Sequence, residues 1–260
     1  MKNELNIVAI QSGIVWEKPE VNLEYFDQQI SKLPSTVDLV ILPEMFTTGF
    51  SMNPISIAET MEGPSIKWMV ATAKVNCLAL VGSIVIKENA QYFNRLFFIH
   101  PNGHIETYDK RHLFTLAKEN DHYTSGEERL IVLYKGWRIC PLICYDLRFP
   151  VWSRNTNEYD LLIYVANWPS IRINAWDTLL KARAIENMTY CIGVNRVGED
   201  ENGYEYNGHT AIYNFLGEKI SSTIEGKENV LQSVIFKTKL IKLRQKLNFL
   251  QDQDAFQIEK

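Results

Sequence analysis

The sequence has few of the features that mark membrane proteins, secreted proteins or nucleic-acid-binding proteins. No run approaches the ~18 consecutive apolar residues of a membrane-spanning helix, and the first apolar stretch, Leu5–Ile10, is too short for a secretion signal. Basic residues number 27 and acidic residues 31, giving a net charge of −4, so no positive surplus exists to hold nucleic acid or an anionic membrane. We therefore expect a cytoplasmic enzyme that acts on small molecules.

Cysteine is also scarce, with four residues at positions 77, 140, 144 and 191. Without a secretion signal, these are expected to be reduced thiols. Cys140 and Cys144 lack the spacing of a redox pair, and no histidine stands at zinc-ligand spacing to either, so no metal site is expected. Cys77 and Cys191 fit small, buried core residues.

The chain also lacks repeats, low-complexity tracts and a flexible linker, so we expect one domain over residues 1–260. A polar tail from about residue 240 is expected to pack on this domain or on a partner. Helices are expected after Pro19, after Pro64 and over Trp176–Asn187. Strands are expected at Leu5–Ile10, Asp38–Pro43, Leu78–Ile86, Tyr92–His100, Arg138–Cys144, Leu161–Ala166, Tyr190–Asn195, His209–Asn214 and Val230–Phe236. This alternation followed by antiparallel strands predicts an α/β layered fold with a mixed sheet.

Polar groups able to do chemistry follow the apolar runs of this pattern. Cys144 ends one such run, and the ends of strands are where α/β folds place their sites. Glu44 ends another, and a carboxylate directly after a buried strand is costly unless it is paired or functional. Lys110 is the third candidate. Together they offer a nucleophile, a general base and a cation for a developing oxyanion. Spacing alone leaves open that Cys144 is a core cysteine, Glu44 a turn residue and Lys110 a solvated charge.

Four sequence motifs resemble those of one known superfamily. They are Leu42–Glu44 (LPE), Tyr108–Phe114 (YDKRHLF), Cys144–Pro150 (CYDLRFP) and Arg183–Asn187 (RAIEN). Their order and spacing resemble the nitrilase, or carbon–nitrogen hydrolase, superfamily. The resemblance extends from about residue 5 to about residue 236, which is most of the chain.

The resemblance implies an α-β-β-α sandwich and a catalytic set of Glu44, Lys110 and Cys144. It also implies catalysis without a metal or organic cofactor, and a homodimer or larger homo-oligomer. In this chemistry the thiol attacks the carbon of an amide, and a thioester intermediate is then hydrolysed.

Many members use a second glutamate that stands seven residues before a glycine. Glu119 stands so before Gly126, which makes Glu119 the fourth predicted catalytic residue. Glu127 and Glu128 are rivals that fit this spacing less well and are otherwise solvated charges.

Within the superfamily, the chain is most similar to bacterial omega-amidases, which hydrolyse the terminal amide of 2-oxoglutaramate and 2-oxosuccinamate. The carboxylate of such a substrate needs a cationic partner, and Arg148 has the planar fork that suits it. A structural ion pair with Asp146, or a helix C-terminus, is an equally good role for Arg148. Tyr145 and Trp168 are predicted to line the substrate pocket, although Trp168 fits the core as well.

The residues after Glu44 have two interpretations. Phe46 and Phe50 form either a mobile rim of the pocket, with Gly49 as its hinge, or an apolar loop that packs on a neighbouring subunit.

Two other functions remain open at this point. One is another amide or ureide hydrolase of the superfamily, such as an N-carbamoyl-amino-acid hydrolase or a deaminated-glutathione amidase. The other is a catalytically inactive scaffold, which the presence of all four required residue types argues against.

Overall fold

Apolar runs of the first half, together with one strand from near the C-terminus, form a six-stranded sheet in the computed structural model, which describes residues 2–156 and 159–258. The strand order is β13–β1–β2–β3–β4–β5. β1, β2 and β3 are parallel, whereas β13, β4 and β5 each pair antiparallel with their neighbours. The strands are β1 (Glu4–Gln11), β2 (Leu39–Ile41), β3 (Ala79–Glu88), β4 (Gln91–Ile99), β5 (Ile105–Asp109) and β13 (Asn229–Phe236).

A second sheet of five strands has the order β12–β9–β8–β7–β6, with β7, β8 and β9 parallel. Its strands are β6 (Val132–Tyr134), β7 (Trp137–Ile143), β8 (Leu161–Ala166), β9 (Tyr190–Asn195) and β12 (Ala211–Tyr213). β7 accommodates Pro141 because β6 pairs with it only as far as Ile139. Pro141 therefore has a neighbouring strand on one side, where it lies opposite Ile163 of β8.

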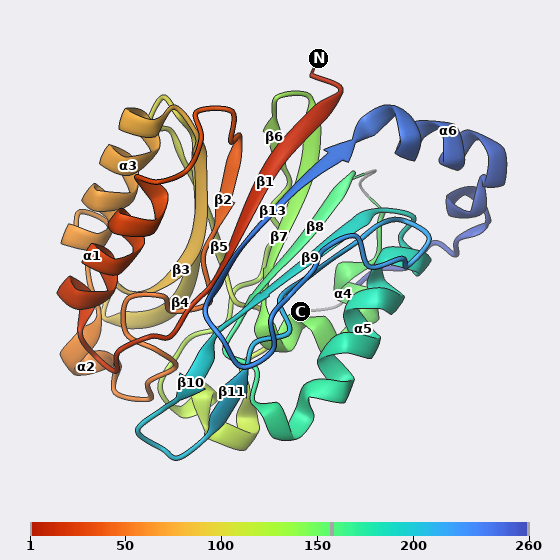
Figure 1. Ribbon diagram of the computed structural model, residues 1–260. Coiled ribbons are helices and arrows are strands. Elements are labelled where there is room, and N and C mark those ends of the chain that lie inside the picture. The colour runs from red at the N-terminus through yellow and green to blue at the C-terminus, as the bar shows by residue number, and fades with distance from the viewer. Residues whose placement is uncertain (1, 157–158, 259–260) are drawn as a thin grey trace.

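The two sheets lie face to face (Figure 1). Alternate residues of β1 therefore contribute to two different cores. Leu5, Ile7 and Ala9 belong to the core shared with the five-stranded sheet, whereas Val8 and Ile10 belong to a second core on the other face. A strand with apolar residues on both faces is buried on both sides.

Helices cover the outer faces of the two sheets (Figure 1). α1 (Pro19–Ile30) and α3 (Pro64–Asn76) begin with proline, as expected, and pack on the six-stranded sheet. α5 (Ile173–Glu186) buries Trp176 and Leu180 against the five-stranded sheet. The four layers form the α-β-β-α sandwich, which confirms the predicted fold class.

The remaining elements are short. They are the helices α2 (Pro54–Ile57) and α4 (Pro150–Ser153), the 3₁₀ turns η1 (Thr115–Ala117), η2 (Glu119–Asp121), η3 (Cys144–Arg148), η4 (Ser170–Arg172) and η5 (Phe249–Asp252), and the hairpin of β10 (Val197–Glu199) and β11 (Glu205–Asn207). Among the described residues, every helix is too short or too polar to cross a lipid bilayer.

The C-terminal segment packs on its own domain, which is one of the two alternatives left open by the sequence. α6 (Lys237–Leu247) begins before the expected boundary near residue 240, because the side chain of Leu240 is fully buried in the core. Arg244 then donates from Nε to the carbonyl oxygen of Met188 at 2.9 Å and from Nη2 to that of Tyr159 at 2.6 Å.

Candidate active site

Four predicted site residues gather at one edge of the facing sheets. Glu44 follows β2, Lys110 follows β5, Cys144 follows β7, and Glu119 begins η2. Glu44, Lys110 and Glu119 have no exposed surface, and Cys144 is 9% exposed. Lys110 is therefore not a solvated charge, whereas Glu44 does lie in a turn, as a fully buried residue.

Lys110 joins the two glutamates through hydrogen-bonded ion pairs. Its Nζ donates to Oε1 of Glu44 at 2.8 Å, and to Oε1 and Oε2 of Glu119 at 3.0 and 2.9 Å. All three side chains are fully buried. A buried charge is tolerated when it is paired and hydrogen-bonded in this way.

The charges of the cluster set the protonation of its members. Burial alone would lower the pKa of the Lys110 ammonium, but the negative charges of Glu119 and Glu44 outweigh it and raise that pKa. Burial raises the pKa of Glu119 despite the attraction of Lys110. Burial, and then the charge of Glu44, raise the pKa of the Cys144 thiol well above its usual range. The raised pKa keeps Cys144 a neutral thiol at neutral pH.

Two asparagines, which the sequence did not single out, hold Glu44 in place. Nδ2 of Asn94 donates to Oε1 of Glu44 at 2.8 Å, and the backbone N–H of Asn167 donates to Oε2 at 2.8 Å. Nδ2 of Asn167 also donates to the carbonyl oxygen of Glu44 at 2.6 Å. Asn94 is a fully buried amide in the middle of β4, and that polar interruption was the signal available in the sequence.

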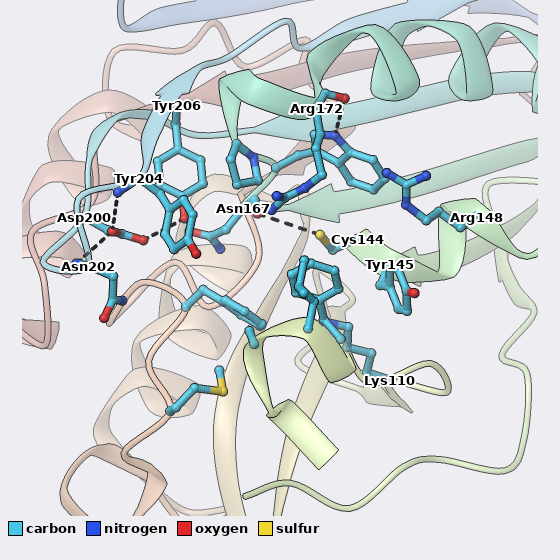
Figure 2. A pocket seen from close by; sticks show the side chains of 17 residues that line it. Lys110, Cys144, Tyr145, Arg148, Asn167, Arg172, Asp200, Asn202, Tyr204 and Tyr206 are labelled. Atoms are coloured by element: carbon cyan, nitrogen blue, oxygen red, sulfur yellow. Dashed lines mark hydrogen bonds between the residues drawn. The ribbon is translucent and has the colours of Figure 1, made fainter. Parts of the chain in front are cut away.

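Cys144 is the first residue of η3 and lies in the sharp turn that follows β7. Its backbone φ is +40°, a region that non-glycine residues rarely adopt and that costs on the order of 1–3 kcal/mol. The Sγ atom lies 3.9 Å from the carbonyl oxygen of Asn167, to which it donates a weak hydrogen bond (Figure 2). In this turn Cys144 lines a pocket while it also belongs to the core cluster.

Gly126 explains why the sequence places a glycine after Glu119. A Cβ at Gly126 would lie 2.2 Å from the backbone carbonyl oxygen of Asp109, and the N–H of Gly126 donates to the carbonyl of Lys110 at 2.9 Å. The glycine therefore lets the chain approach the Lys110 segment closely. The rivals Glu127 and Glu128 are exposed. Of these three glutamates, Glu119 is the one that the structure places beside Lys110.

A pocket of about 300 Å³ opens in front of Cys144 and Lys110. Figure 2 shows Arg148 and Arg172 together on one side of Cys144, with Lys110 on the other. Tyr145 also lines this pocket, as predicted.

Arg148 lies over the ring of Trp168, with its guanidinium carbon 4.9 Å from the ring centroid. Among residues 2–156 and 159–258 it has no hydrogen-bonded or ion-paired partner. Asp146 instead binds Tyr108 and His112, so the alternative of an Arg148–Asp146 ion pair is wrong. Trp168 has both of its predicted roles, because it lines the pocket and is 3% exposed in the core.

Arg172 is a second arginine of the pocket, which sequence reasoning missed. It lies on η4 with its guanidinium carbon 5.3 Å from the ring centroid of Phe114, and its side chain has no polar partner within the described part of the chain. The far wall comes from the β10–β11 hairpin, through Asp200 and Tyr206. These residues lie on short elements and a loop, where the sequence gives little periodic signal.

Two expectations from the sequence were wrong. Phe46 is not part of a mobile rim, because it is fully buried against Phe26 and Trp68. Phe50 does line the pocket, with its ring centroid 4.9 Å from Nζ of Lys110. Cys77 is exposed at the end of α3 and is not a core residue.

One group of three side chains in the described ranges could hold a metal ion. His100 and His104 lie in the turn between β4 and β5, and Glu106 lies near the start of β5, at the other end of β5 from Lys110. Nε2 of His100 and Oε1 of Glu106 are hydrogen-bonded at 2.7 Å. This group is therefore separate from the pocket.

Comparison with known proteins identifies the family to which this site belongs. The sequence profile of the carbon–nitrogen hydrolases matches residues 7–244. The chain belongs to the carbon–nitrogen hydrolase family. The omega-amidase YafV of Escherichia coli (strain K12) is 42% identical to it over 255 residues, which cover 98% of each protein.

Two further carbon–nitrogen hydrolases extend the comparison. The 2-oxoglutaramate amidase of Bacillus subtilis (strain 168) is 32% identical over 220 residues, covering 83% of this chain and 85% of that protein. The solved structure of XC1258 from Xanthomonas campestris, a CN-hydrolase superfamily protein with an arsenic adduct in its active site, is 41% identical. It has a TM-score of 0.97 and covers 99% of this chain and 100% of that one. The predicted superfamily and the prediction of an amide-hydrolysing enzyme are confirmed.

Proposed function

We propose that this carbon–nitrogen hydrolase is an omega-amidase, which hydrolyses the terminal amide of 2-oxo-dicarboxylic acid monoamides such as 2-oxoglutaramate and 2-oxosuccinamate. The observation that carries the proposal is the composition of the pocket. A thiol, the lysine of a buried Glu–Lys–Glu cluster and two arginines without polar partners among the described residues line one cavity. The similarity to YafV and to the 2-oxoglutaramate amidase supports the same substrate class.

The first half of the reaction forms a thioester. Glu44 takes the proton of Cys144 as Sγ attacks the amide carbon, and the carbonyl oxygen becomes an oxyanion. Lys110 Nζ and the backbone N–H of Tyr145 stabilise this oxyanion, and one such donor is worth about 2.7–4 kcal/mol. Glu44 then gives its proton to the leaving nitrogen, the carbon–nitrogen bond breaks, and ammonia departs.

The second half releases the acid. Glu44 takes a proton from a water molecule that attacks the thioester carbon, and Glu119 orients the base through Lys110. The carbon–sulfur bond breaks, the thiolate of Cys144 recovers the proton from Glu44, and the 2-oxo acid leaves. No step needs an oxidant or a reductant.

The two arginines supply the cationic end of the pocket. A substrate whose amide lies at Cys144 carries its carboxylate at its other end, and Arg148 and Arg172 lie on one side of Cys144 (Figure 2). A guanidinium binds a carboxylate through two parallel hydrogen bonds, with planes that match. Tyr145 and Trp168 also line this pocket.

Ammonia release tests this proposal. The protein would be assayed with 2-oxoglutaramate, glutamine, an N-carbamoyl amino acid and a simple nitrile, with Cys144→Ala as the control. We expect release from 2-oxoglutaramate alone, and its loss in the variant. Turnover of the carbamoyl compound instead would keep the catalytic residues and replace the substrate, whereas full activity of Cys144→Ala would refute the assignment.

Arginine variants test the substrate end. Arg172→Met should lower kcat/KM for 2-oxoglutaramate by about 10- to 100-fold, since a hydrogen bond to a charged group is worth about 1.5–3 kcal/mol. An uncharged amide of similar length is the matched control, and its turnover should change little. Equal losses for both substrates would contradict carboxylate binding by this residue.

A single domain, a cytoplasmic location and a homodimer or larger homo-oligomer remain predictions from the sequence. Light scattering on the purified protein measures the oligomeric state directly.

A further inference from the structure

The buried carboxylate of Asp146, two residues after the nucleophile, has every acceptor position filled. Its Oδ2 accepts from Oη of Tyr108 at 2.7 Å and from the backbone N–H of Ile143 at 3.0 Å. Its Oδ1 accepts from the backbone N–H of His112 at 3.0 Å and from Nδ1 of the same residue at 2.8 Å. Because a carboxylate only accepts, Nδ1 carries the proton of this last hydrogen bond.

These partners belong to the two segments that carry the reacting groups. Ile143 directly precedes Cys144, at the end of the five-stranded sheet. Tyr108 and His112 flank Lys110, at the end of the six-stranded sheet. The Asp146 carboxylate therefore accepts hydrogen bonds from the backbone next to Cys144 and from residues on both sides of Lys110. Lys110 is the cation that is proposed to hold the oxyanion.

The Lys110 side of this network is held by further contacts. Oη of Tyr108 also accepts from the backbone N–H of Arg111 at 3.1 Å and from Nε1 of Trp152 at 3.0 Å. The imidazole of His112 stacks on Phe149, with ring centroids 3.6 Å apart and planes 5° apart. The position of this segment is thus fixed by hydrogen bonds and by ring packing.

The reaction needs this fixed relation. The oxyanion forms on the oxygen bonded to the carbon that Sγ attacks, so Cys144 and Lys110 must keep one separation from attack to product release. A misplacement of 1 Å in such a geometry costs about 100-fold in rate. The φ of +40° at Cys144 is also unfavourable and persists only if its surroundings hold it.

We propose that Asp146 is a positioning residue of the reaction, which sets the separation of Cys144 and Lys110, and that the Nδ1–H of His112 is part of this device. The proposal rests on the catalytic roles given under the proposed function. Neither side chain touches the substrate in this role.

The Asp146→Asn replacement would keep the size of the side chain and lose its positioning function. It offers one oxygen acceptor and one NH₂ donor group where the aspartate offers two oxygens. Whichever way the amide turns, its NH₂ group faces the backbone N–H of Ile143 or that of His112. One of these buried N–H groups is left without an acceptor, and the segment that carries it must shift.

Position 112 offers a matched pair of variants. His112→Ala removes the donor and the ring stacked on Phe149, whereas His112→Asn places an amide NH₂ close to the position of Nδ1. The side chain of His112 is 21% exposed, and neither replacement adds volume to the packed interior.

The experiment measures kcat and KM for 2-oxoglutaramate in the full-length protein. Asp146→Asn and His112→Ala should lower kcat by about 10- to 100-fold, with KM within about threefold, since the substrate carboxylate still meets its arginines. His112→Asn should recover most of the lost kcat. If Asp146 and His112 had a purely structural role, their variants would have a lower unfolding midpoint. The effects on kcat and KM would then not separate, and His112→Asn would not recover kcat.

Asp38→Asn is the control for the loss of a buried carboxylate. Asp38 is 2% exposed. Like Asp146 it accepts from a backbone N–H, that of Asn6, and it also accepts from the ammonium groups of Lys2 and Lys135. It lies at the opposite end of β2 from Glu44, so its replacement should affect stability and leave kcat unchanged.

The outcomes separate this proposal from the proposed function. If the parent protein hydrolyses 2-oxoglutaramate and the Cys144→Ala variant does not, the proposed function holds. Unchanged kcat in both Asp146→Asn and His112→Ala would then overturn the positioning role alone. If Asp146→Asn does not fold, the position-112 pair decides, and equal kcat values for His112→Ala and His112→Asn would overturn the role. An inactive unchanged protein would overturn both.

Discussion

Replacing Lys110 with methionine removes the one ammonium that separates two buried carboxylates. Methionine has a similar length and keeps the volume filled, so the change isolates the charge. The ammonium makes three hydrogen bonds of 2.8–3.0 Å to Glu44 and Glu119, and the exposed fraction of all three side chains is 0%.

Breaking such a buried pair costs about 3–5 kcal/mol of unfolding free energy. Without the cation, two neighbouring carboxylates cannot both stay ionised, so one takes up a proton and its pKa rises above its unfolded value. A carboxyl group with a raised pKa stabilises the fold below its unfolded pKa, and this contribution is lost as the pH rises through the folded pKa. The destabilisation of Lys110→Met should therefore be largest at pH 7 and smaller at pH 5.

Urea unfolding followed by tryptophan fluorescence measures this difference at the two pH values. Glu119→Gln in the Lys110→Met background removes one carboxylate and should restore part of the stability at pH 7. A Lys110→Met protein within about 1 kcal/mol of the parent at pH 7, or with equal losses at both pH values, would refute the buried-charge reasoning, since a broken buried pair costs several times more.

Three further variants test other parts of the structure. Burial alone would raise the pKa of Asp38, but its N–H and ammonium partners outweigh burial and lower it, so its stabilisation is present at neutral pH and lost in acid. Asp38→Asn should lower the unfolding free energy at pH 7 and flatten its acid decline in urea titrations. A Cβ at Gly193 would lie 2.4 Å from Leu180 and 2.5 Å from Trp176, so Gly193→Ala should cost about 1–3 kcal/mol in the same assay, and an unchanged midpoint would contradict this. Gly126→Ala should displace the Lys110 segment and lower kcat more than KM in the ammonia assay; an unchanged kcat would show that the segment can yield.

The sequence indicated the core strands because they depend on local patterns, whereas the grouping of Glu44, Lys110, Glu119 and Cys144 came from the resemblance to the carbon–nitrogen hydrolases. Apolar runs that end in Glu44 and Cys144 show the strand and the polar group together. β5 was missed because it is an edge strand with a single buried residue, Tyr108, and its apolar pattern is weak. Arg172 was missed because its place in the pocket depends on the path of a loop.

The wrong expectation for Phe46 has a similar cause. A Cβ at Gly82 would lie 2.8 Å from the ring of Phe46, so the phenylalanine fills the space that this glycine of β3 leaves open. The two residues are far apart in the sequence, and their complementarity is visible only after the strands are placed. Local periodicity carries no information about such a pair.

The sharing of Lys110 by two glutamates has a consequence for how this site can change over evolutionary time. Loss of any one member leaves an uncompensated charge or an unpaired donor in the interior, so each single step away from the trio is penalised in folding as well as in catalysis. A descendant that abandons the chemistry must replace the members together. The trio is therefore inherited or discarded as a unit, whereas the arginines of the pocket, without polar partners in the described chain, are free to change one at a time with the substrate.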